Sequence, residues 1–257
     1  MDKISACIIS FNEETKIEDC LKSLVGVVDE IIVVDSCSTD QTVKITSRYT
    51  DKIFSQPFLG YAQQKNMAIE KASYNWILSL DCDERLSEEL TQAIQKLKSN
   101  IGRFDAYRMA RKTFYVYRWL NHCWYPNIRI RLFNKQKAEW GGGDLHEKII
   151  MQSNKISLIP GDILHYSFDS ISAHIQTLDK FTEIGAQEII KRGKKVTALT
   201  PLSHAVWTFV RMYFLRRGFL DGRAGWVASV LSFVHVYTKY NKVLFARKMW
   251  KKHRSSD

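Results

Sequence analysis

The stretch Trp76–Glu84, WILSLDCDE, joins a strand-like run to a cluster of acidic residues. Its first five residues have the character of a buried β-strand, yet three carboxylates, those of Asp81, Asp83 and Glu84, follow within four residues. Crowded carboxylates repel one another and raise one another's proton affinity. The cluster therefore indicates either a bound cation or a loop and helix start that extend into solvent.

Strand-like runs upstream of this stretch alternate with helical patterns. Residues 3–10 (KISACIIS) and 30–36 (EIIVVDS) are rich in β-branched side chains, and a shorter run lies near residues 52–56. Helical patterns occupy residues 17–24 and 61–72. This rhythm of strand and helix predicts an α/β fold with a mostly parallel, doubly wound sheet.

Three of the predicted strands end in polar or acidic residues. These endings are Asn12–Glu14, Asp35–Ser36 and Asp81–Asp83. Ligands of such sheets bind at the carboxyl ends of the strands. We therefore expect the three groups to line one edge of the sheet and to form the functional site.

The first turn excludes a standard dinucleotide site. Residues 10–14 (SFNEE) contain no glycine and two acids, whereas a dinucleotide fold needs G-x-G-x-x-G at this place, and no Walker loop is present either. A phosphate-bearing ligand among these carboxylates would need a cation. Asp81 and Asp83, at i and i+2 of an extended chain, point to the same side and suit Mg²⁺ or Mn²⁺. The alternative is that they are the solvated start of a helix at Ser87.

Composition limits the class of protein. The 257 residues are 45% hydrophobic, which is enough for one large domain or one domain with an appendage. The five cysteines contain no CxxC pair and indicate reduced thiols in a cytosolic setting, not a disulfide framework or a zinc site. The N-terminal apolar run is too short for a signal peptide.

Charge is distributed unevenly along the chain. Residues 191–257 contain 15 Lys and Arg but two acids, whereas the remainder of the chain has a balance of −2. With His counted as neutral, no uncharged run in this segment, Ala224–Thr238 included, exceeds 15 residues, fewer than the ~18–20 that span a bilayer. Basic residues that flank Trp-containing apolar stretches are typical of helices in a membrane interface. The alternatives are a basic appendage packed on the core and a nucleic-acid partner, for which no binding-module motif is present.

After residue 105 the pattern changes. Residues 105–117 and 127–134 alternate apolar and basic side chains and are predicted to be strands. A last short strand is predicted within residues 156–168. From residue 170 onward the sequence is expected to be mostly helical.

Five motifs, in their order along the chain, resemble glycosyltransferase family 2: ISFNEE, VVDSCSTD, GYAQQKN, LSLDCDE and LHE. Further stretches resemble the branch of lipopolysaccharide-core β-1,4-glucosyltransferases: WYPNIRIRLF, GGGDLHE, ILHYSF and FLRRGFLDGRAG. The resemblance covers about residues 3–168 well and the remainder more loosely. It implies a GT-A fold, a nucleotide-sugar donor and a D-x-D metal motif.

The resemblance also implies a domain organisation. Residues 1–168 would form the GT-A catalytic domain, with its nucleotide-sugar half at about 1–100 and its acceptor side at about 101–168. Residues 169–257 would form a helical, basic, membrane-interfacial segment.

For the donor, the resemblance implies roles at five positions. Asn12 and Glu14 would border the base and ribose, and Asp35 would accept a hydrogen bond from either. Lys65 would face the uracil and diphosphate side, although it could equally be an exposed helix lysine. Asp81 would contact the ribose or a metal-bound water.

For the metal, Mn²⁺ or Mg²⁺, the resemblance implies direct binding by Asp83, supported by Glu84. His165, in ILHYSF, resembles the late histidine that some GT-A enzymes use as a metal ligand. A lone histidine at a strand end is also commonly structural.

An inverting transferase needs a base that deprotonates the acceptor hydroxyl as it attacks the anomeric carbon. Many family members use an aspartate in an acidic pair, whereas this sequence has Leu145-His146-Glu147 after three glycines. Glu147 is the first candidate for the base and Asp144 the second. His146 could orient the base, contact phosphate or simply pack.

Acceptor contacts are expected from four residues. Aromatic faces suit sugar rings, and arginine forks suit phosphate or carboxylate groups. The candidates are Trp124, Tyr125, Arg129 and Arg131, with core packing as the alternative for Trp124 and a strand-edge charge for Arg129.

We therefore expect an inverting, metal-dependent glycosyltransferase that moves glucose from UDP-glucose onto a lipid-linked saccharide, such as the lipopolysaccharide inner core. We expect it in the cytoplasm, peripheral on the inner face of the plasma membrane. The alternatives are a transferase of another polysaccharide or glycan pathway, a D-x-D phosphohydrolase with Asp81 as nucleophile, and a non-catalytic membrane or nucleic-acid binding module.

Overall fold

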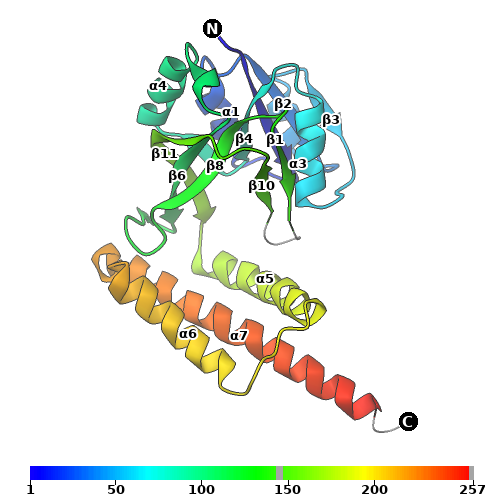
Figure 1. Ribbon diagram of the computed structural model, residues 1–257, viewed down its shortest axis with the longest axis vertical. Coiled ribbons are helices and arrows are strands. Elements are labelled where there is room, and N and C mark those ends of the chain that lie inside the picture. The colour runs from blue at the N-terminus through cyan, green and yellow to red at the C-terminus, as the bar shows by residue number, and fades with distance from the viewer. Residues whose placement is uncertain (143–146, 255–257) are drawn as a thin grey trace. The chain divides into compact units, whose positions relative to one another are not determined.

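The computed structural model describes residues 1–142 and 147–254 and divides into two compact units (Figure 1). The sheet unit comprises residues 1–112 and 126–166, and the helical unit comprises residues 113–125 and those from 167 onward. Each unit draws on two separate stretches of the chain.

The first half of the sheet unit contains four parallel strands in the order β3-β2-β1-β4. Their bounds are β1 Ile4–Ser10, β2 Glu30–Asp35, β3 Ile53–Ser55 and β4 Trp76–Asp81. In the register of these strands Ser10 pairs with Asp35, and Ile9 pairs with Asp81. The acidic ends of β2 and β4 therefore lie at the same edge, as the sequence predicts.

Helices cover both faces of this parallel sheet. Their bounds are α1 Ile17–Leu24, α2 Thr42–Thr46, α3 Tyr61–Glu70 and α4 Glu88–Leu97. The side chains of β1 alternate between two cores: Ala6 and Ile8 belong to the core that includes residues of α1 and α4, while Cys7 belongs to the core that includes residues of α3. This is the doubly wound arrangement that period-2 alternation in a buried strand produces.

The second half of the sheet is antiparallel and makes the whole sheet mixed. β8 (Asn127–Asn134) pairs antiparallel with both β4 and β6 (Ala106–Tyr115), and β11 (Ile156–Phe168) pairs antiparallel with β5 (Glu84–Leu86). β11 has 13 residues, so the expected short strand is in fact the longest of the described strands. The hairpin of β9 (Ala138–Gly141) and β10 (Lys148–Met151) forms a separate small sheet.

One glycine permits β11 to pass close to α4. Gly161 has φ +90°, and a Cβ atom there would lie 2.4 Å from the backbone nitrogen of Leu90. Beside it, the Ser87 hydroxyl accepts hydrogen bonds from the backbone N–H groups of Leu90 and Asp162. The predicted N-cap of α4 thus also fixes the strand that carries His165.

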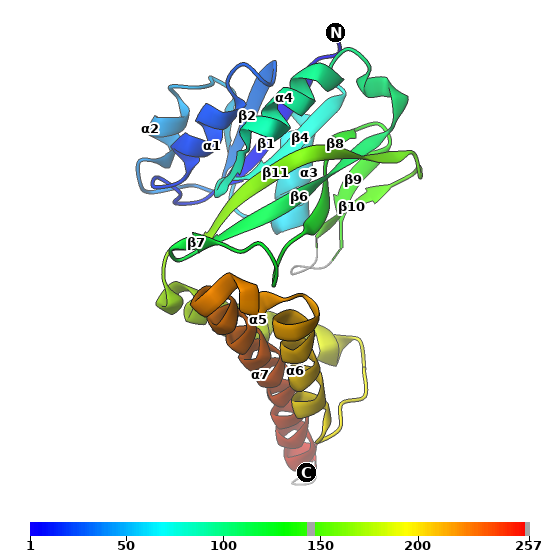
Figure 2. The same cartoon turned by 90° about the vertical axis from the view of Figure 1, so that its left-hand side faces the viewer.

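The helical unit contains α5 (Ile171–Lys191), α6 (Thr200–Val210) and α7 (Gly222–Arg254), with β7 (Arg118–Trp119) beside the end of β6 (Figure 2). A π-helical turn, Arg211–Leu215, and a 3₁₀ turn, Gly218–Asp221, join α6 to α7. Within the described residues, none of the helices combines the length and apolar character that crossing a membrane requires.

Candidate active site

The candidate site lies at the carboxyl edge of the parallel strands and has Asp81 at its centre. Lys65 Nζ lies 2.8 Å from Asp81 Oδ1, and Arg131 Nη2 lies 2.9 Å from Asp81 Oδ2. Lys65 comes from α3 and is 4% exposed, so it is not the exposed helix lysine of the alternative reading. Each oxygen of Asp81 therefore faces a different buried cation.

Glu84 fixes the turn that follows β4. It is fully buried, and its carboxylate accepts hydrogen bonds from the backbone N–H of Asp81 at 3.0 Å, from Arg131 at 2.8 Å and from Arg111 at 3.1 Å. A buried carboxylate with this many charge-assisted donors is satisfied and held in place. Glu84 has the supporting position expected of it, but the sequence did not point to Arg111.

These contacts set the charge of the site. Burial alone would raise the pKa of Asp81, but the charges of Lys65 and Arg131 hold it well below the usual value for aspartate. Burial alone would lower the pKa of Arg131, but the charges of Glu84 and Asp81 raise it. The aspartate is therefore ionised and the arginine protonated at neutral pH, and about a third of the Asp81 side chain stays exposed.

Asp83 meets His165 beside this network. Asp83 Oδ2 lies 3.1 Å from His165 Nε2, and the backbone N–H of Tyr166 donates to the carbonyl oxygen of Asp83. The pairing of β11 with β5, which places His165 opposite Glu84, brings these residues together.

This pair fits a small divalent cation. Neighbouring ligands of an octahedral ion with bonds of about 2.1 Å lie about 3 Å apart, and the observed separation matches that spacing. One carboxylate with substrate phosphates is a usual Mg²⁺ ligand set, and imidazole is an acceptable ligand for Mn²⁺. No group of three or more potential His, Cys, Asp or Glu ligands occurs among the described residues.

Glu147 also lies at the site. Its Oε1 is 3.3 Å from Lys65 Nζ, and its side chain is 23% exposed. The Lys65 ammonium lies 4.4 Å from the centre of the Trp140 ring, so it is enclosed by Asp81, Glu147 and an aromatic face. The second candidate base, Asp144, and His146 lie outside the described residues.

Asn66 holds the strand that leads toward Glu147. Its side-chain amide donates to the carbonyl oxygen of Trp140 at 2.8 Å and accepts from the Trp140 backbone N–H at 2.9 Å. Two adjacent residues of α3 thus contact the two sides of the glycine-rich segment: Asn66 contacts Trp140 before it, and Lys65 contacts Glu147 after it. Asn66 was not among the predicted site residues, although it stands beside Lys65 in the motif GYAQQKN.

The predicted donor residues at the first two strands lie in the segments at the C-terminal ends of β1 and β2, and hydrogen bonds join these two segments. Asp35, 2% exposed, accepts hydrogen bonds from the Ser10 hydroxyl and from the backbone and hydroxyl of Ser38. Asn12 and Glu14 are exposed, and they accept from the backbone N–H groups of Thr39 and Gln41. Asp35 is therefore engaged in shaping these segments, whereas Asn12 and Glu14 lie at their surface.

The four predicted acceptor residues are placed differently from one another. Trp124 and Tyr125 belong to the helical unit, where Trp124 packs edge-on against Tyr115. Arg129 is exposed as a whole residue, but partial desolvation of its guanidinium, together with the charges of Arg111 and Arg131, lowers its pKa. Arg131 is 5% exposed and bonded to Asp81 and Glu84, so it is part of the buried network and not a surface group.

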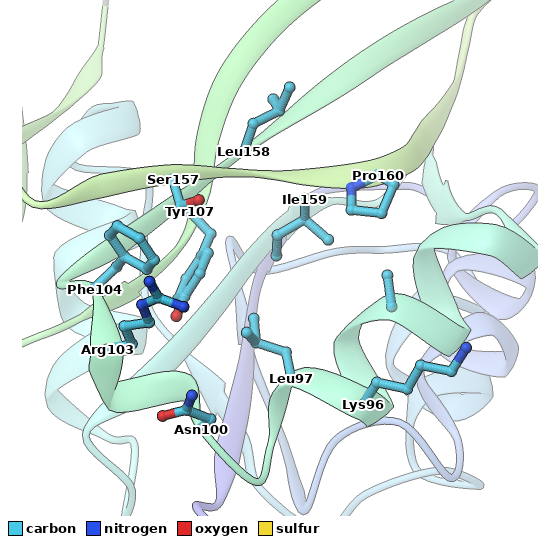
Figure 3. A pocket seen from close by; sticks show the side chains of 11 residues that line it. Lys96, Leu97, Asn100, Arg103, Phe104, Tyr107, Ser157, Leu158, Ile159 and Pro160 are labelled. Atoms are coloured by element: carbon cyan, nitrogen blue, oxygen red, sulfur yellow. The ribbon is translucent and has the colours of Figure 1, made fainter.

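A pocket of about 400 Å³ lies elsewhere in the sheet unit (Figure 3). Leu97 and Asn100 line it from α4 and the turn that follows, and Leu158 to Pro160 line it from β11. It contains none of the predicted site residues.

Comparison with known proteins agrees with this architecture. Residues 5–154, more than half of the chain, match the family model "Glycosyl transferase family 2". An uncharacterized glycosyltransferase of Rickettsia typhi is 33% identical over 250 residues, which are 90% of this chain and 83% of that protein. The lipopolysaccharide core biosynthesis glycosyltransferase LpsC of Rhizobium meliloti is 27% identical, over 92% of this chain and 93% of that protein.

The fold agrees as well. The mannosyltransferase PcManGT from Pyrobaculum calidifontis, solved with GDP-Man and Mn²⁺, superposes with a TM-score of 0.55 at 13% identity, covering 95% of this chain and 87% of that chain. The expected GT-A type of mixed α/β fold, with helices in the C-terminal segment, is confirmed. The chain belongs to glycosyltransferase family 2 and is a glycosyltransferase.

Proposed function

We propose that this protein is an inverting, metal-dependent glycosyltransferase that moves glucose from UDP-glucose onto a lipid-linked saccharide of the lipopolysaccharide inner-core type. The observation that carries the proposal is the juxtaposition of Asp83 and His165, 3.1 Å apart, at the strand edge where Lys65 links Asp81 to Glu147. The name of LpsC, a lipopolysaccharide core glycosyltransferase, supports the acceptor class.

Asp83 and His165 would hold Mg²⁺ or Mn²⁺. When bound, the ion supplies charge neutralisation for the departing diphosphate. The chain's own contribution at this point is to keep the two ligands aligned, through the Tyr166 backbone hydrogen bond to Asp83 and the pairing of β5 with β11.

Glu147 would accept the proton of the acceptor hydroxyl. Lys65 contacts its Oε1, which leaves the second oxygen available for that proton. Asp144 remains the second candidate for this role.

The two hydrogen-bonded segments at the C-terminal ends of β1 and β2 would border the nucleotide. Asn12 and Glu14, which lie at their surface, would contact the base and ribose, and Asp35 would act by holding these segments in shape. Asp81, with about a third of its side chain exposed, would present its free face to the ribose or to a metal-bound water.

The acceptor candidates are Arg129, in the sheet unit, and Tyr125, in the helical unit, each considered by itself. An exposed guanidinium suits the phosphate or carboxylate groups of an anionic saccharide, and an aromatic ring suits a sugar face. The strongly basic segment fits an acceptor embedded in an anionic membrane, so we place the protein on the inner face of the plasma membrane.

The phosphohydrolase reading has less support. An aspartate nucleophile attacks through a carboxylate oxygen, and both oxygens of Asp81 are ion-paired, one to Lys65 and one to Arg131, which makes them poorer nucleophiles. Recovery of an aspartyl-phosphate at Asp81 would reverse this assessment.

The test is UDP release by the purified protein with a panel of nucleotide sugars and Mn²⁺, Mg²⁺ or EDTA. Asp83→Asn, which keeps the shape but removes the charge, should abolish metal-dependent release, while Asp51→Ala, at an exposed aspartate, should leave it unchanged. Glu147→Gln should retain donor binding and lose transfer to an added acceptor, by about 10²–10⁴-fold. Absence of metal-dependent nucleotide binding in the wild type would refute the proposal.

A further inference from the structure

The turn between α6 and α7 exposes apolar and basic side chains that the transfer reaction does not use. Two apolar pairs are about half exposed: Phe214 and Leu215 at 55% and 62%, Phe219 and Leu220 at 46% and 51%. Four exposed arginines accompany them, namely Arg211, Arg216, Arg217 and Arg223. We call these eight residues the basic-apolar tip.

The inner side of the same turn is rigidly packed. Asp221 is fully buried, and its carboxylate accepts hydrogen bonds from three successive backbone N–H groups, those of residues 121–123, and from His122 Nδ1 at 2.9 Å. A Cβ atom on Gly225 would lie 2.0 Å from the carbonyl oxygen of Gly218, so the backbone segments touch there. The exposed residues are therefore presented by a fixed turn.

The backbone at the centre of the turn adopts an uncommon conformation. Arg217 has φ +55°, in the left-handed region that non-glycine residues seldom occupy, and it follows a π-helical turn. Such conformations persist where the surrounding structure fixes them, and they concentrate at functional sites. Here the conformation separates the two apolar pairs and places Arg216 and Arg217 between them.

The chemistry of the tip favours an anionic lipid surface. Large exposed apolar groups next to arginines suit a bilayer interface, where the apolar groups reach the acyl boundary and the cations meet phosphates. The one acid within residues 211–226, Asp221, is buried, so no carboxylate on the tip opposes this attraction. Exposed tryptophans at positions 207 and 226 are also typical of membrane interfaces.

Other occupants fit less well. A second copy of the chain, paired through the same surface, would bring two sets of four arginines together, and like charges repel. Nucleic acid matches the arginines but offers no apolar phase for two half-exposed pairs of phenylalanine and leucine.

We propose that the basic-apolar tip inserts its Phe214–Leu215 and Phe219–Leu220 pairs into an anionic bilayer surface, with the four arginines bound to lipid phosphates. The proposal rests on the proposed function in one respect: membrane binding would bring the transferase to a membrane-embedded acceptor. The binding itself requires no substrate.

The experiment is co-sedimentation of the full-length protein with phosphatidylcholine vesicles, with and without phosphatidylglycerol, at low and high salt. The apolar variant is Phe214→Ser with Leu215→Ser, and the charge variant is Arg216→Gln with Arg217→Gln. The matched control is Phe58→Ser with Leu59→Ser, the same dipeptide at similar exposure, 53% and 50%, in the sheet unit. Circular dichroism checks that each variant is folded.

The wild type should bind phosphatidylglycerol vesicles, more weakly at high salt. Partitioning should fall by about tenfold or more in the apolar variant, and by roughly fivefold for each arginine removed in the charge variant. The control should match the wild type. The proposal is overturned if the wild type does not bind vesicles or if the tip variants bind vesicles as well as the control does. It is also overturned if the tip variants keep vesicle binding but lose self-association or RNA binding. UDP release by the tip variants should be normal, so failure of the transferase proposal is detected separately.

Discussion

At the scale of single residues, Lys65 joins two carboxylates from distant parts of the chain. Asp81 ends β4 and Glu147 precedes β10, and one buried ammonium contacts both. Burying a lysine is costly unless its charge is compensated, and here two acids and the Trp140 ring do so. Lys65 thus positions the candidate base relative to the donor side of the site.

The lowered pKa of Asp81 predicts a particular dependence of stability on pH. Because its pKa is depressed in the folded protein, Asp81 contributes stability above its unfolded pKa, about 3.9, and loses that contribution as the pH falls through the folded value. We expect Asp81→Asn to lower the free energy of unfolding by about 2–3 kcal/mol at pH 7, less than for a fully buried pair because the side chain is partly exposed. The difference should shrink below about pH 4.

Urea unfolding of wild type and Asp81→Asn between pH 3 and pH 8 measures this effect. Asp51→Ala, at an exposed aspartate, serves as the control and should show no such pH-dependent difference. A constant difference across the whole range would mean that the ion pairs with Lys65 and Arg131 do not depress the pKa in solution.

At the scale of elements, α3 contacts the β9–β10 hairpin at two points and holds it in place. Asn66 bonds to the backbone of Trp140 in β9, and Lys65 contacts Glu147 just before β10. Two consecutive residues of one helix thus hold both sides of the segment that contains the candidate base. This assigns Asn66 a positioning role that acts through the backbone of Trp140.

Asn66→Ala should therefore impair acceptor transfer more than donor binding. Misplacing a reacting group by about 1 Å can cost 10²-fold in rate, and we expect a roughly tenfold or greater fall in kcat for transfer, with the KM for the donor nearly unchanged. The ratio of transfer to donor hydrolysis should fall as well. A merely structural role would lower both rates together.

Steady-state kinetics with and without acceptor distinguish the two outcomes. Asn100→Ala, at an exposed asparagine in the sheet unit, is the matched control and should behave like the wild type. Equal losses of hydrolysis and transfer in Asn66→Ala would contradict a positioning role for Asn66.

At the scale of the whole molecule, the chain forms two units, and Asp221 joins two distant stretches of the helical one. Its carboxylate joins the start of α7 to residues 121–123, about a hundred positions earlier in the chain. Burial alone would raise the pKa of Asp221, but the hydrogen bonds from Cys123, His122 and Asn121 lower it. The helical unit thus depends on a contact between two separate stretches of chain.

Removing this carboxylate should destabilise the helical unit selectively. Asp221→Ala leaves several buried donors without an acceptor, and we expect a loss of about 3 kcal/mol. Native-state hydrogen exchange should show faster exchange in α6 and α7, while β1 and β4 stay close to wild type. Equal loss of protection in both units would indicate that they unfold as one cooperative block.

Strands β1 to β4, the helices α1 and α3, the helix start at Ser87 and the acidic ends of β2 and β4 follow from side-chain periodicity and local hydrogen bonding, which are properties of neighbouring residues. The short strand β5 was not predicted, because its pairing with β11 is a long-range contact. The family also follows from short motifs in their order along the chain.

Which side chains meet depends on the tertiary structure. The antiparallel register of β8 on β4 carries Arg131 to Asp81, and the turn after β4 directs Glu84 inward to Arg111, so an arginine predicted to contact the acceptor lies in a buried network. Equally, the exposed pairs at the basic-apolar tip depend on the packing of Asp221 beneath them. Such pairings join residues tens of positions apart, and because strand register and long-range packing set them, no local pattern in the sequence encodes them.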